Sequence, residues 1–462
     1  MKTVMKFGGS SLASAERVTY VAKLIKKHVE QGYRPMIVCS AMGKTTNGLL
    51  SAGDFALKGT VSTDSLRTLH LTTAEELGLP PSTKEMINTM MTELEKLLEG
   101  IRCIGELTPR TKDYLVSFGE RLSVRIVAAT LNKMGVPAQA FDSWTLGMRT
   151  TSEFGNADVK EETYETMKGL VSKIDSNLVA VVTGFIGHDD DGRITTLGRG
   201  GSDLSATVLG TAAGVDEIQV WKDVDGIMTT DPRLVKQALP VNQVTYEEAA
   251  ELAYFGAEVL HPIAMQPAIR SQIPVRVKNS YNPSAVGTAI TSTRDKSSTL
   301  VTAITSKSGV QLIDIVSTRM LGQYGFLAEV FNVFQECEVS VDVIASSEVS
   351  LSLTLDKKQR EKYDTQKLID KLNKFADTTV FEDRAIVTLI SNLDRSSEVM
   401  AIAFKVMEKL GITVEMFSQG ASKVNISFVI QMKDREAVIR ALHACFFEGI
   451  RPEDLERGVQ DY

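Results

Sequence analysis

The sequence predicts an α/β protein in which a mostly parallel sheet lies between helix layers, followed by two smaller α+β modules. Up to about residue 290, continuous apolar runs typical of buried strands alternate with stretches of helical periodicity. This alternation indicates a parallel sheet covered on both faces. Further along the chain, one segment of mixed strand and helix character occurs twice.

The first predicted strand and helix flank a glycine turn. Residues 3–7 are typical of a strand, and from about Ser14 apolar side chains fall at helical spacing until Gly32. Between them, the stretch KFGGSS from Lys6 to Ser11 places a lysine and two glycines at the junction. Backbone amides at such a junction approach a ligand closely and favour an anion. A tight turn with an exposed lysine is the alternative that this stretch alone leaves open.

Three further strands are predicted at residues 35–40, 179–184 and 217–221. In an open α/β sheet, ligands bind at loops beyond the carboxyl ends of the strands, where the glycine-rich stretches of this chain fall. The small and polar residues that follow Tyr281 predict a linker.

The repeated segment defines the two modules of the tail. Residues 331–343 match residues 404–416, and after a two-residue insertion residues 348–353 match residues 423–428. Each copy is predicted to run strand, helix, strand, alternating strand, helix. Repeated modules of this size are expected to bind a ligand or to pair with each other, and no residue in them indicates catalysis.

Composition excludes several classes of protein. A chain of 462 residues with net charge -7 predicts two or three domains, and without a long basic run neither nucleic acid nor a membrane is an expected partner. The four cysteines and five histidines are dispersed without metal-ligand spacing, so we expect no protein-bound metal site. A strand begins almost at once, so no signal peptide is expected and a cytoplasmic location is predicted, with the plastid stroma open if a transit peptide has been removed.

Several stretches of the first domain carry chemical groups at predicted strand ends and helix starts. FGERLS holds Glu120, which suits an ammonium group, and GRGGSD holds Arg199, whose planar fork suits a carboxylate. Lys222 and Asp223 directly follow a predicted strand, where they are placed to meet a nucleotide. The stretch SAMGKTT contains GKT, but it fails the P-loop pattern because Val38 stands at the position of the first glycine.

Six stretches together resemble the aspartate kinases along essentially the whole chain: KFGGSS, SFGERLS, TTLGRGGSD, WKDVDGIMTTDPR, ELAYFGAEVLHP and IPVRVKNS. The tail segments TRMLGQYGFLAEVF, SVDVIASSEVSLSLTLD and SQGASKVNISF resemble the paired ACT domains of that family. They are most similar to those of lysine-sensitive, single-function plant and cyanobacterial members. The resemblance implies an amino acid kinase domain at residues 1–292 and ACT domains at 308–384 and 385–462, with no homoserine dehydrogenase half.

This resemblance implies phosphorylation of the L-aspartate side chain by Mg-ATP to 4-phospho-L-aspartate, the first step of lysine, threonine and methionine biosynthesis. Lys6 and Asp203 would be catalytic. The nucleotide would be bound by Lys6, Gly8, Gly9, Ser40, Lys222, Asp223 and Arg233. L-Aspartate would be bound by Glu120, Arg199 and Ser202. Mg²⁺ would be held mainly by the nucleotide, with no ligand set in the protein.

For the tail, the resemblance implies that L-lysine binds between ACT modules of two subunits and inhibits the enzyme. The matching positions are Met320, Gly325, Phe326, Leu327, Val341, Asp342, Ser347 and Glu348. Asp342 and Glu348 could pair with the two ammonium groups of lysine, while amides near Gly325 receive its carboxylate. Alternatively, these acids only cap strands and solvate an edge. A response to S-adenosylmethionine is also implied, and a homodimer or larger homo-oligomer through the ACT modules is expected because exposed module edges need covering.

Two positions depart from the family pattern. Glu258 stands where many members have a lysine that is commonly assigned to nucleotide binding, and Met228 stands where several bacterial members have tyrosine. The charge reversal at Glu258 puts that nucleotide contact in doubt, and His261 in the same motif is expected to be structural. Two alternatives therefore stay open, namely a related kinase that acts on glutamate and an amino-acid sensor with a degenerate kinase domain.

Overall fold

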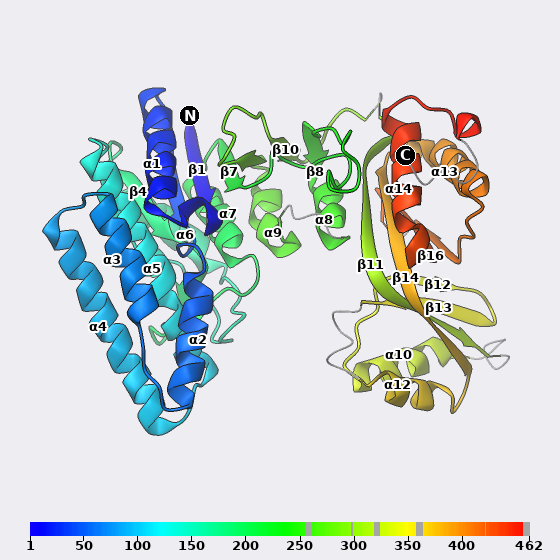
Figure 1. The fold of residues 1–462 in the computed structure, drawn as a ribbon, viewed down its shortest axis with the longest axis horizontal. Helices are drawn as coiled ribbons and strands as arrows, with labels where there is room; N and C mark the ends of the chain where they lie inside the picture. Colours follow the sequence, from blue (N-terminus) through cyan, green and yellow to red (C-terminus); the bar gives the residue numbers. More distant parts are fainter. Residues whose placement is uncertain (256–259, 297–298, 318–323, 357–363, 421, 456–462) are drawn as a thin grey trace. The chain divides into compact units, whose positions relative to one another are not determined.

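The computed structural model describes residues 1–255, 260–296, 299–317, 324–356, 364–420 and 422–455 (Figure 1). The chain divides into two compact units. The first comprises Met1–Ile227, Asn242–Ala249 and Val259–Arg294, and the second comprises Met228–Val241, Ala250–Glu258 and Asp295–Tyr462. The domain ranges 1–292, 308–384 and 385–462 stay a prediction.

The first unit alternates strands and helices in most of its length. Its strands are β1 (Lys2–Phe7), β2 (Arg34–Cys39), β3 (Ala138–Phe141), β4 (Val179–Thr183), β5 (Ile186–His188), β6 (Ile194–Thr196), β7 (Glu217–Lys222), β8 (Gln243–Thr245), β9 (Val275–Asn279) and β10 (Thr288–Thr291). Its helices are α1 (Ala15–Glu30), α2 (Thr45–Leu57), α3 (Asp64–Glu76), α4 (Pro81–Ile104), α5 (Pro109–Lys133), α6 (Glu162–Val171), α7 (Gly201–Ala213), α8 (Tyr246–Tyr254) and α9 (Pro262–Ser271). Helix α8 ends in residues that belong to the second unit.

Among the described residues, eight strands form one sheet in the order β3-β4-β2-β1-β7-β9-β10-β8. All pairs in it are parallel except β9 with β10. The predicted mostly parallel sheet is therefore confirmed. Because β1, β2, β4 and β7 run in the same direction, their carboxyl ends meet at one edge, and loops from four strands converge there.

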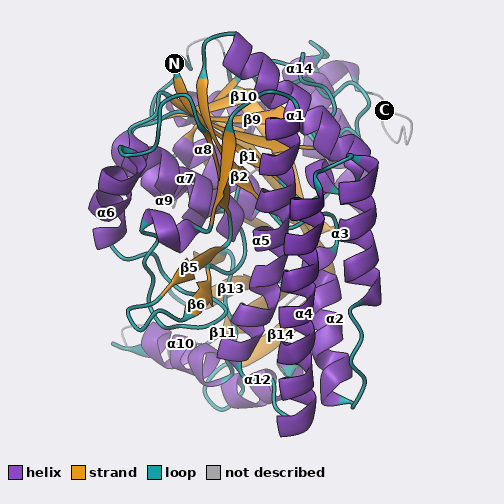
Figure 2. Ribbon diagram, turned by 90° about the vertical axis from the view of Figure 1, so that its left-hand side faces the viewer, coloured by secondary structure: helices purple, strands orange, loops and turns teal. Residues whose placement is uncertain are grey.

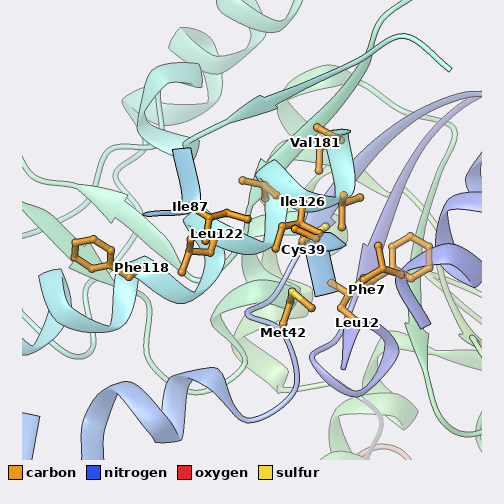
Figure 3. Close-up of a cluster of buried hydrophobic side chains, with 14 of the residues drawn as sticks. Phe7, Leu12, Cys39, Met42, Ile87, Phe118, Leu122, Ile126 and Val181 are labelled. Atoms are coloured by element: carbon orange, nitrogen blue, oxygen red, sulfur yellow. The ribbon is translucent and has the colours of Figure 1, made fainter. Parts of the chain in front are cut away.

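Helices cover both faces of this sheet (Figure 2). Helices α1 and α5 pack on one face, with α2 and α4 against α5, and α7 packs on the other face beside α6 and α9. Between the strands and α5 lies a core of buried apolar side chains that includes Phe7, Cys39, Leu122, Ile126 and Val181 (Figure 3). This burial holds the strand ends and α5 in fixed positions beside each other.

The individual element predictions for this unit are largely confirmed. Ser14 caps α1 by accepting a hydrogen bond from the backbone amide of Arg17, and the helix ends before Gly32, as the apolar spacing indicates. The predicted linker after Tyr281 is wrong in part, because it contains β10, whose Ile290 is fully buried. A short alternating run in a polar context gave too little periodicity to identify this strand.

The second unit contains one sheet, in the order β12-β13-β11-β14-β16-β15, with helices packed on it. Its strands are β11 (Val301–Val316), β12 (Ile344–Ser346), β13 (Ser350–Leu355), β14 (Asp377–Ser391), β15 (Met416–Gln419) and β16 (Asn425–Gln431). Its helices are α10 (Phe326–Glu336), α12 (Thr365–Leu372), α13 (Ser396–Leu410) and α14 (Arg435–Phe447). The pairs α10 and α13, β12 and β15, β13 and β16, and α12 and α14 follow the predicted repeat, which is confirmed.

The two modules share the long strands β11 and β14. The second half of β11 pairs with the first half of β14, and the first half of β11 pairs with the second half of β14. Val301 and Ile304 at the start of β11 thus join the core of α13 and α14. The first half of β11 therefore completes the second module, although it comes before the first module in the chain.

Candidate active site

The end of β1 and the turn after it form one side of the site. Lys6 lies near the carboxyl end of β1 and is only 7% exposed. The chain then passes two glycines and enters the short 3-10 helix Ser10–Leu12. A Cβ on Gly9 would lie 2.9 Å from the carbonyl oxygens of Ala41 and Gly43. The close approach of the loops after β1 and β2 therefore requires glycine at this position.

Asp203, in the first turn of α7, joins two lysines from two strands. Its Oδ1 lies 2.6 Å from Nζ of Lys6, and its Oδ2 lies 3.9 Å from Nζ of Lys222 at the end of β7. Burial by itself would raise the pKa of Asp203, but the charges of Lys6 and Lys222 outweigh it and hold this pKa below its ordinary value. Asp203 is therefore ionised at neutral pH and holds both ammonium groups in place.

Glu120 reaches the same region from α5. It is 3% exposed, and its Oε1 accepts a hydrogen bond of 3.0 Å from the backbone amide of Ala41. Its Oε2 is buried and has no hydrogen-bond partner among the residues that the structure describes. Burial raises the pKa of Glu120 to about 8, although the amide of Ala41 and the charge of Lys6 oppose the shift. A buried carboxyl oxygen without a partner is suited to receive a cationic ligand group.

These groups line a pocket of about 420 Å³ at the carboxyl edge of the sheet. Of the residues predicted to act on substrates, it brings together Lys6, Gly9, Ser40, Glu120, Ser202 and Asp203. Its other lining residues are Ala41, Gly43, Lys44, Thr46, Asn47, Phe185, Gly198, Gly200 and Gly201. Ammonium groups, loop amides and the Glu120 carboxyl, whose pKa is raised, thus converge in one pocket. Such a pocket can receive a molecule that carries both anionic and cationic groups.

Five residues of the predicted site do not line this pocket: Gly8, Arg199, Lys222, Asp223 and Arg233. Gly8 lies two residues after Lys6 in the chain, and Lys222 is tied to the pocket through Asp203. Asp223 is exposed directly after β7. Arg233 belongs to the second unit, where its Nη2 lies 2.8 Å from Oδ2 of Asp231.

Arg199 lies in a loop shaped by two glycines that line the pocket. Gly198 and Gly200 both have positive φ angles, of 68° and 74°. A Cβ on Gly200 would lie 2.6 Å from Cβ of His261, so the backbone of the loop packs closely on the residue that precedes α9. The Arg199 side chain is exposed, without a hydrogen bond or ion pair to any residue that the structure describes. Its guanidinium group is therefore available to an anionic ligand.

Sequence reasoning missed part of the pocket. Gly43, Lys44, Thr46 and Asn47 lie in the loop after β2 and the first turn of α2 and line the pocket. The first three belong to the stretch SAMGKTT, which does not fit the P-loop pattern, and Asn47 follows it directly. Its GKT sequence was nevertheless the signal that could have identified these residues, because a glycine and a lysine before a helix suit an anion in more than one kind of loop.

In the tail, the predicted effector positions differ in their surroundings. Met320 lies outside the described residues, as does Glu258 of the nucleotide motif. Gly325 caps α10 with φ 90°, Phe326 is buried in the core of the first module, and Leu327 and Glu348 are exposed. Of the three remaining positions, Val341 packs against that core, and the Oγ of Ser347 lies 2.7 Å from that of Ser350.

Asp342 is already engaged by neighbouring groups. Its Oδ2 lies 2.6 Å from Nζ of Lys307, and its Oδ1 accepts a hydrogen bond of 2.8 Å from the hydroxyl group of Tyr254. Lys307 also lies 3.1 Å from Asp356. The sequence did not reveal that an internal ammonium group occupies this carboxylate.

The described part of the chain offers neither a metal-binding cluster nor a membrane-spanning helix. No group of three or more His, Cys, Asp or Glu side chains there could hold a metal ion. No helix there has the length and apolar character needed to span a bilayer.

Comparison with known proteins identifies the family. The model of the amino acid kinase family matches residues 1–279, and an ACT domain model matches residues 387–446. Aspartokinase 1, chloroplastic, of Arabidopsis thaliana is 52% identical over 460 residues, which cover 96% of this chain and 80% of that protein. The chain belongs to the aspartokinase family. The resemblance inferred from the motifs, the amino acid kinase fold with ACT modules and the assignment to the kinases are thereby confirmed.

Two solved structures of Escherichia coli aspartokinase III match nearly the whole chain. The complex with aspartate and ADP, in the R-state, has a TM-score of 0.80 at 33% identity and covers 97% of this chain and 100% of that one. The complex with lysine and aspartate, in the T-state, has a TM-score of 0.79 at 32% identity and covers 96% and 99%. In this relative, the same fold holds aspartate with ADP in one complex and aspartate with lysine in the other.

Proposed function

We propose that this chain transfers the terminal phosphoryl group of Mg-ATP to the side-chain carboxylate of L-aspartate, which gives 4-phospho-L-aspartate. The observation that carries the proposal is the pocket in which Lys6, Asp203 and Glu120 converge at the carboxyl ends of the strands. The matched relatives are aspartokinases, one of them in complex with aspartate and ADP, which supports the same reaction.

The proposed chemistry depends on positioning and charge neutralisation. A carboxylate with a pKa of about 3.9 is already ionised, so the attack on phosphorus needs no general base. Lys6 would neutralise the transferred phosphoryl group, with Asp203 holding the ammonium group in place. Amides near Gly8, Gly9 and Ser40 would add hydrogen bonds to the phosphates.

We assign the remaining residues of the site to the two substrates. Glu120 would receive the ammonium group of aspartate, Arg199 would bind a carboxylate, and Ser202 would complete the aspartate site. Lys222, Asp223 and Arg233 would bind the nucleotide. Mg²⁺ usually keeps several waters and binds through nucleotide phosphates with few protein carboxylates, so the residues of this pocket suit a nucleotide-held ion that neutralises phosphate charge.

An assay of ADP formation tests the reaction. With Mg-ATP and L-aspartate we expect turnover and an acyl phosphate that hydroxylamine traps, whereas L-glutamate should give little product. Equal turnover of glutamate would favour a related amino acid kinase. Absent turnover together with saturable lysine binding would favour a sensor with a degenerate kinase domain.

We further propose that L-lysine inhibits this enzyme at the ACT modules, with S-adenosylmethionine as a second candidate effector. The proposed site consists of Met320, Gly325, Phe326, Leu327, Val341, Asp342, Ser347 and Glu348. We also propose a homodimer or larger homo-oligomer through these modules, because the edge strands β12 and β15 need covering. The proposed location is the cytoplasm, or the plastid stroma if a transit peptide has been removed.

The internal ion pair of Asp342 gives a test of the effector site. Replacing Lys307 with methionine keeps the side-chain length but removes the ammonium group that engages Asp342. We expect K307M to need about tenfold less L-lysine for half-inhibition, because the effector no longer has to displace an internal cation. The measurement is the concentration of lysine that halves aspartate-dependent ADP formation.

Lys371 provides a matched control in the same module. Its Nζ lies 2.7 Å from Oε2 of Glu336 on the surface, so K371M removes an ion pair without touching Asp342. Lysine sensitivity should be unchanged in this variant. If K307M is inhibited no more readily than K371M, Asp342 does not contribute to the effector site as proposed.

A further inference from the structure

A buried aspartate outside the pocket anchors the loop that carries Arg199. Asp113, near the start of α5, is 2% exposed. Its Oδ2 accepts hydrogen bonds from the backbone amides of Gly155 at 2.9 Å and Thr196 at 2.8 Å, and its Oδ1 accepts one of 2.9 Å from the hydroxyl group of Thr196. Hydrogen bonds between an ionised acceptor and amide donors are among the stronger ones in proteins.

These hydrogen bonds fix two segments beside the loop. The end of β6 precedes the loop in the chain, and residues 155–156 pack against it. Thr196 is the last residue of β6, two positions before Gly198. Gly155 precedes Asn156, whose Oδ1 packs so closely on Gly198 that a Cβ there would lie 2.3 Å from it. The position of the Arg199 loop at the pocket therefore depends on the carboxylate of Asp113.

The same helix carries Glu120. Asp113 and Glu120 are seven positions apart in α5, close to two helical turns, so they project from similar faces of one rigid element. Through Asp113, α5 holds the loop of Arg199, and through Glu120 it supplies the proposed ammonium site. One helix thus sets the spacing between the two groups that we assign to aspartate.

We propose that Asp113 is a positioning residue that keeps the Arg199 loop in register with Glu120 and thereby tunes the site to aspartate rather than to the longer glutamate. This inference rests on the proposed function, in which Arg199 and Glu120 hold the substrate. Glutamate differs by one methylene, so its rejection depends on a fixed spacing between the groups that hold its ends.

The variant D113N tests the proposal, because asparagine keeps the shape but loses the charge, and of its two terminal groups only the carbonyl oxygen still accepts hydrogen bonds. We expect the KM for L-aspartate to rise about tenfold while the KM for ATP changes less than about twofold. The preference for aspartate over glutamate in kcat/KM should fall by about fivefold or more. Variant T196V, which removes only the hydroxyl donor, should show the same changes to a smaller extent, and T196S should restore wild-type values.

Asp189 is a matched control at the other end of the β5–β6 hairpin. It is fully buried, and its carboxylate accepts hydrogen bonds from the backbone amides of Asp191 and Arg193 and from the hydroxyl group of Ser152. D189N loses the same kinds of bonds, together with an ion pair to Arg193, at a place away from Arg199, so its KM for aspartate should stay near the wild-type value. Equal effects of D113N and D189N, or parallel changes in the KM values for aspartate and ATP, would overturn the proposal.

A double-variant cycle shows whether Asp113 acts through Arg199. We expect D113N to add little to the KM for aspartate when R199A is already present. Additive effects would contradict the positioning role. Wild-type protein that fails to use aspartate would instead reject the proposed function, which separates the two failures. If D113N does not fold, the T196V and T196S pair carries the test alone.

Discussion

Replacing Lys6 with methionine should lower kcat for aspartate phosphorylation by about 10³-fold, the largest effect that we expect in this protein. Lys6 is the lysine nearest to Asp203 in the pocket, and its ammonium group is already held in place by that carboxylate before any ligand binds. A fixed positive charge aimed at developing negative charge in a shielded site contributes strongly to the reaction rate. The measurement is steady-state ADP formation at saturating Mg-ATP and aspartate.

The exposed Lys2 on the same strand is the control. K2M removes a lysine from β1 without altering the pocket, so kcat should stay within about twofold of wild type. The KM for aspartate should change little in K6M if the lysine serves the transferred phosphoryl group. A kcat of K6M within tenfold of wild type would reject the catalytic role of Lys6.

Replacing Glu120 with glutamine should raise the KM for L-aspartate by about 30-fold and remove a pH dependence. Burial holds the pKa of Glu120 near 8, so in the free enzyme this carboxyl is mostly protonated at neutral pH. The ammonium group of aspartate binds the ionised form, and the lost charged interaction accounts for the size of the effect. The kcat/KM of the wild type for aspartate should therefore rise with pH toward about 8 and then level off, whereas that of E120Q should not follow this curve.

The stability of the folded protein should fall as the pH rises toward about 8, whereas kcat/KM should rise. The folded-state pKa of Glu120 lies above its ordinary value of 4.5, so the folded protein binds this proton more tightly than the unfolded chain does. Its contribution to the free energy of unfolding is thus complete below pH 4.5 and is lost as the pH rises through about 8. Thermal unfolding of E120Q without ligands should show a smaller decline over this range.

Glu217 is the matched control for Glu120. It is another buried glutamate and forms an ion pair with Arg276. It is the first residue of β7, so it lies away from the carboxyl edge of the sheet. E217Q should keep both the wild-type KM for aspartate and its pH profile. If E120Q also keeps the wild-type profile, the titrating group is another one and Glu120 does not receive the substrate ammonium group.

Much of the fold could be read from local patterns. The alternation of buried strands and amphipathic helices identified β1, α1, β2, β4 and β7, because each element buries apolar side chains at its own period. The internal repeat identified the paired modules. Strand β10 escaped because four residues in a polar stretch carry too little periodicity, although pairing with β9 and β8 buries Ile290.

Part of the pocket could also be anticipated. Lys6, Gly9, Glu120 and Asp203 belong to stretches whose glycines and charges indicate ligand contact, and the structure brings all four to one pocket. Asp113 gave no such signal. A single aspartate in a helical stretch is typical of a solvated surface, and only the burial of α5 against the Arg199 loop reveals its three hydrogen bonds.

The sequence by itself determined the element types, the repeat, the family resemblance and the main residues of the pocket, because these follow from neighbouring positions in the chain. The tertiary structure alone decided which distant groups meet. Lys307 and Asp342 are 35 positions apart yet form an ion pair, and the start of β11 completes a module that follows it in the chain by more than 80 residues. Such pairings depend on which strand edges and helix faces close on each other, and no local pattern encodes that choice.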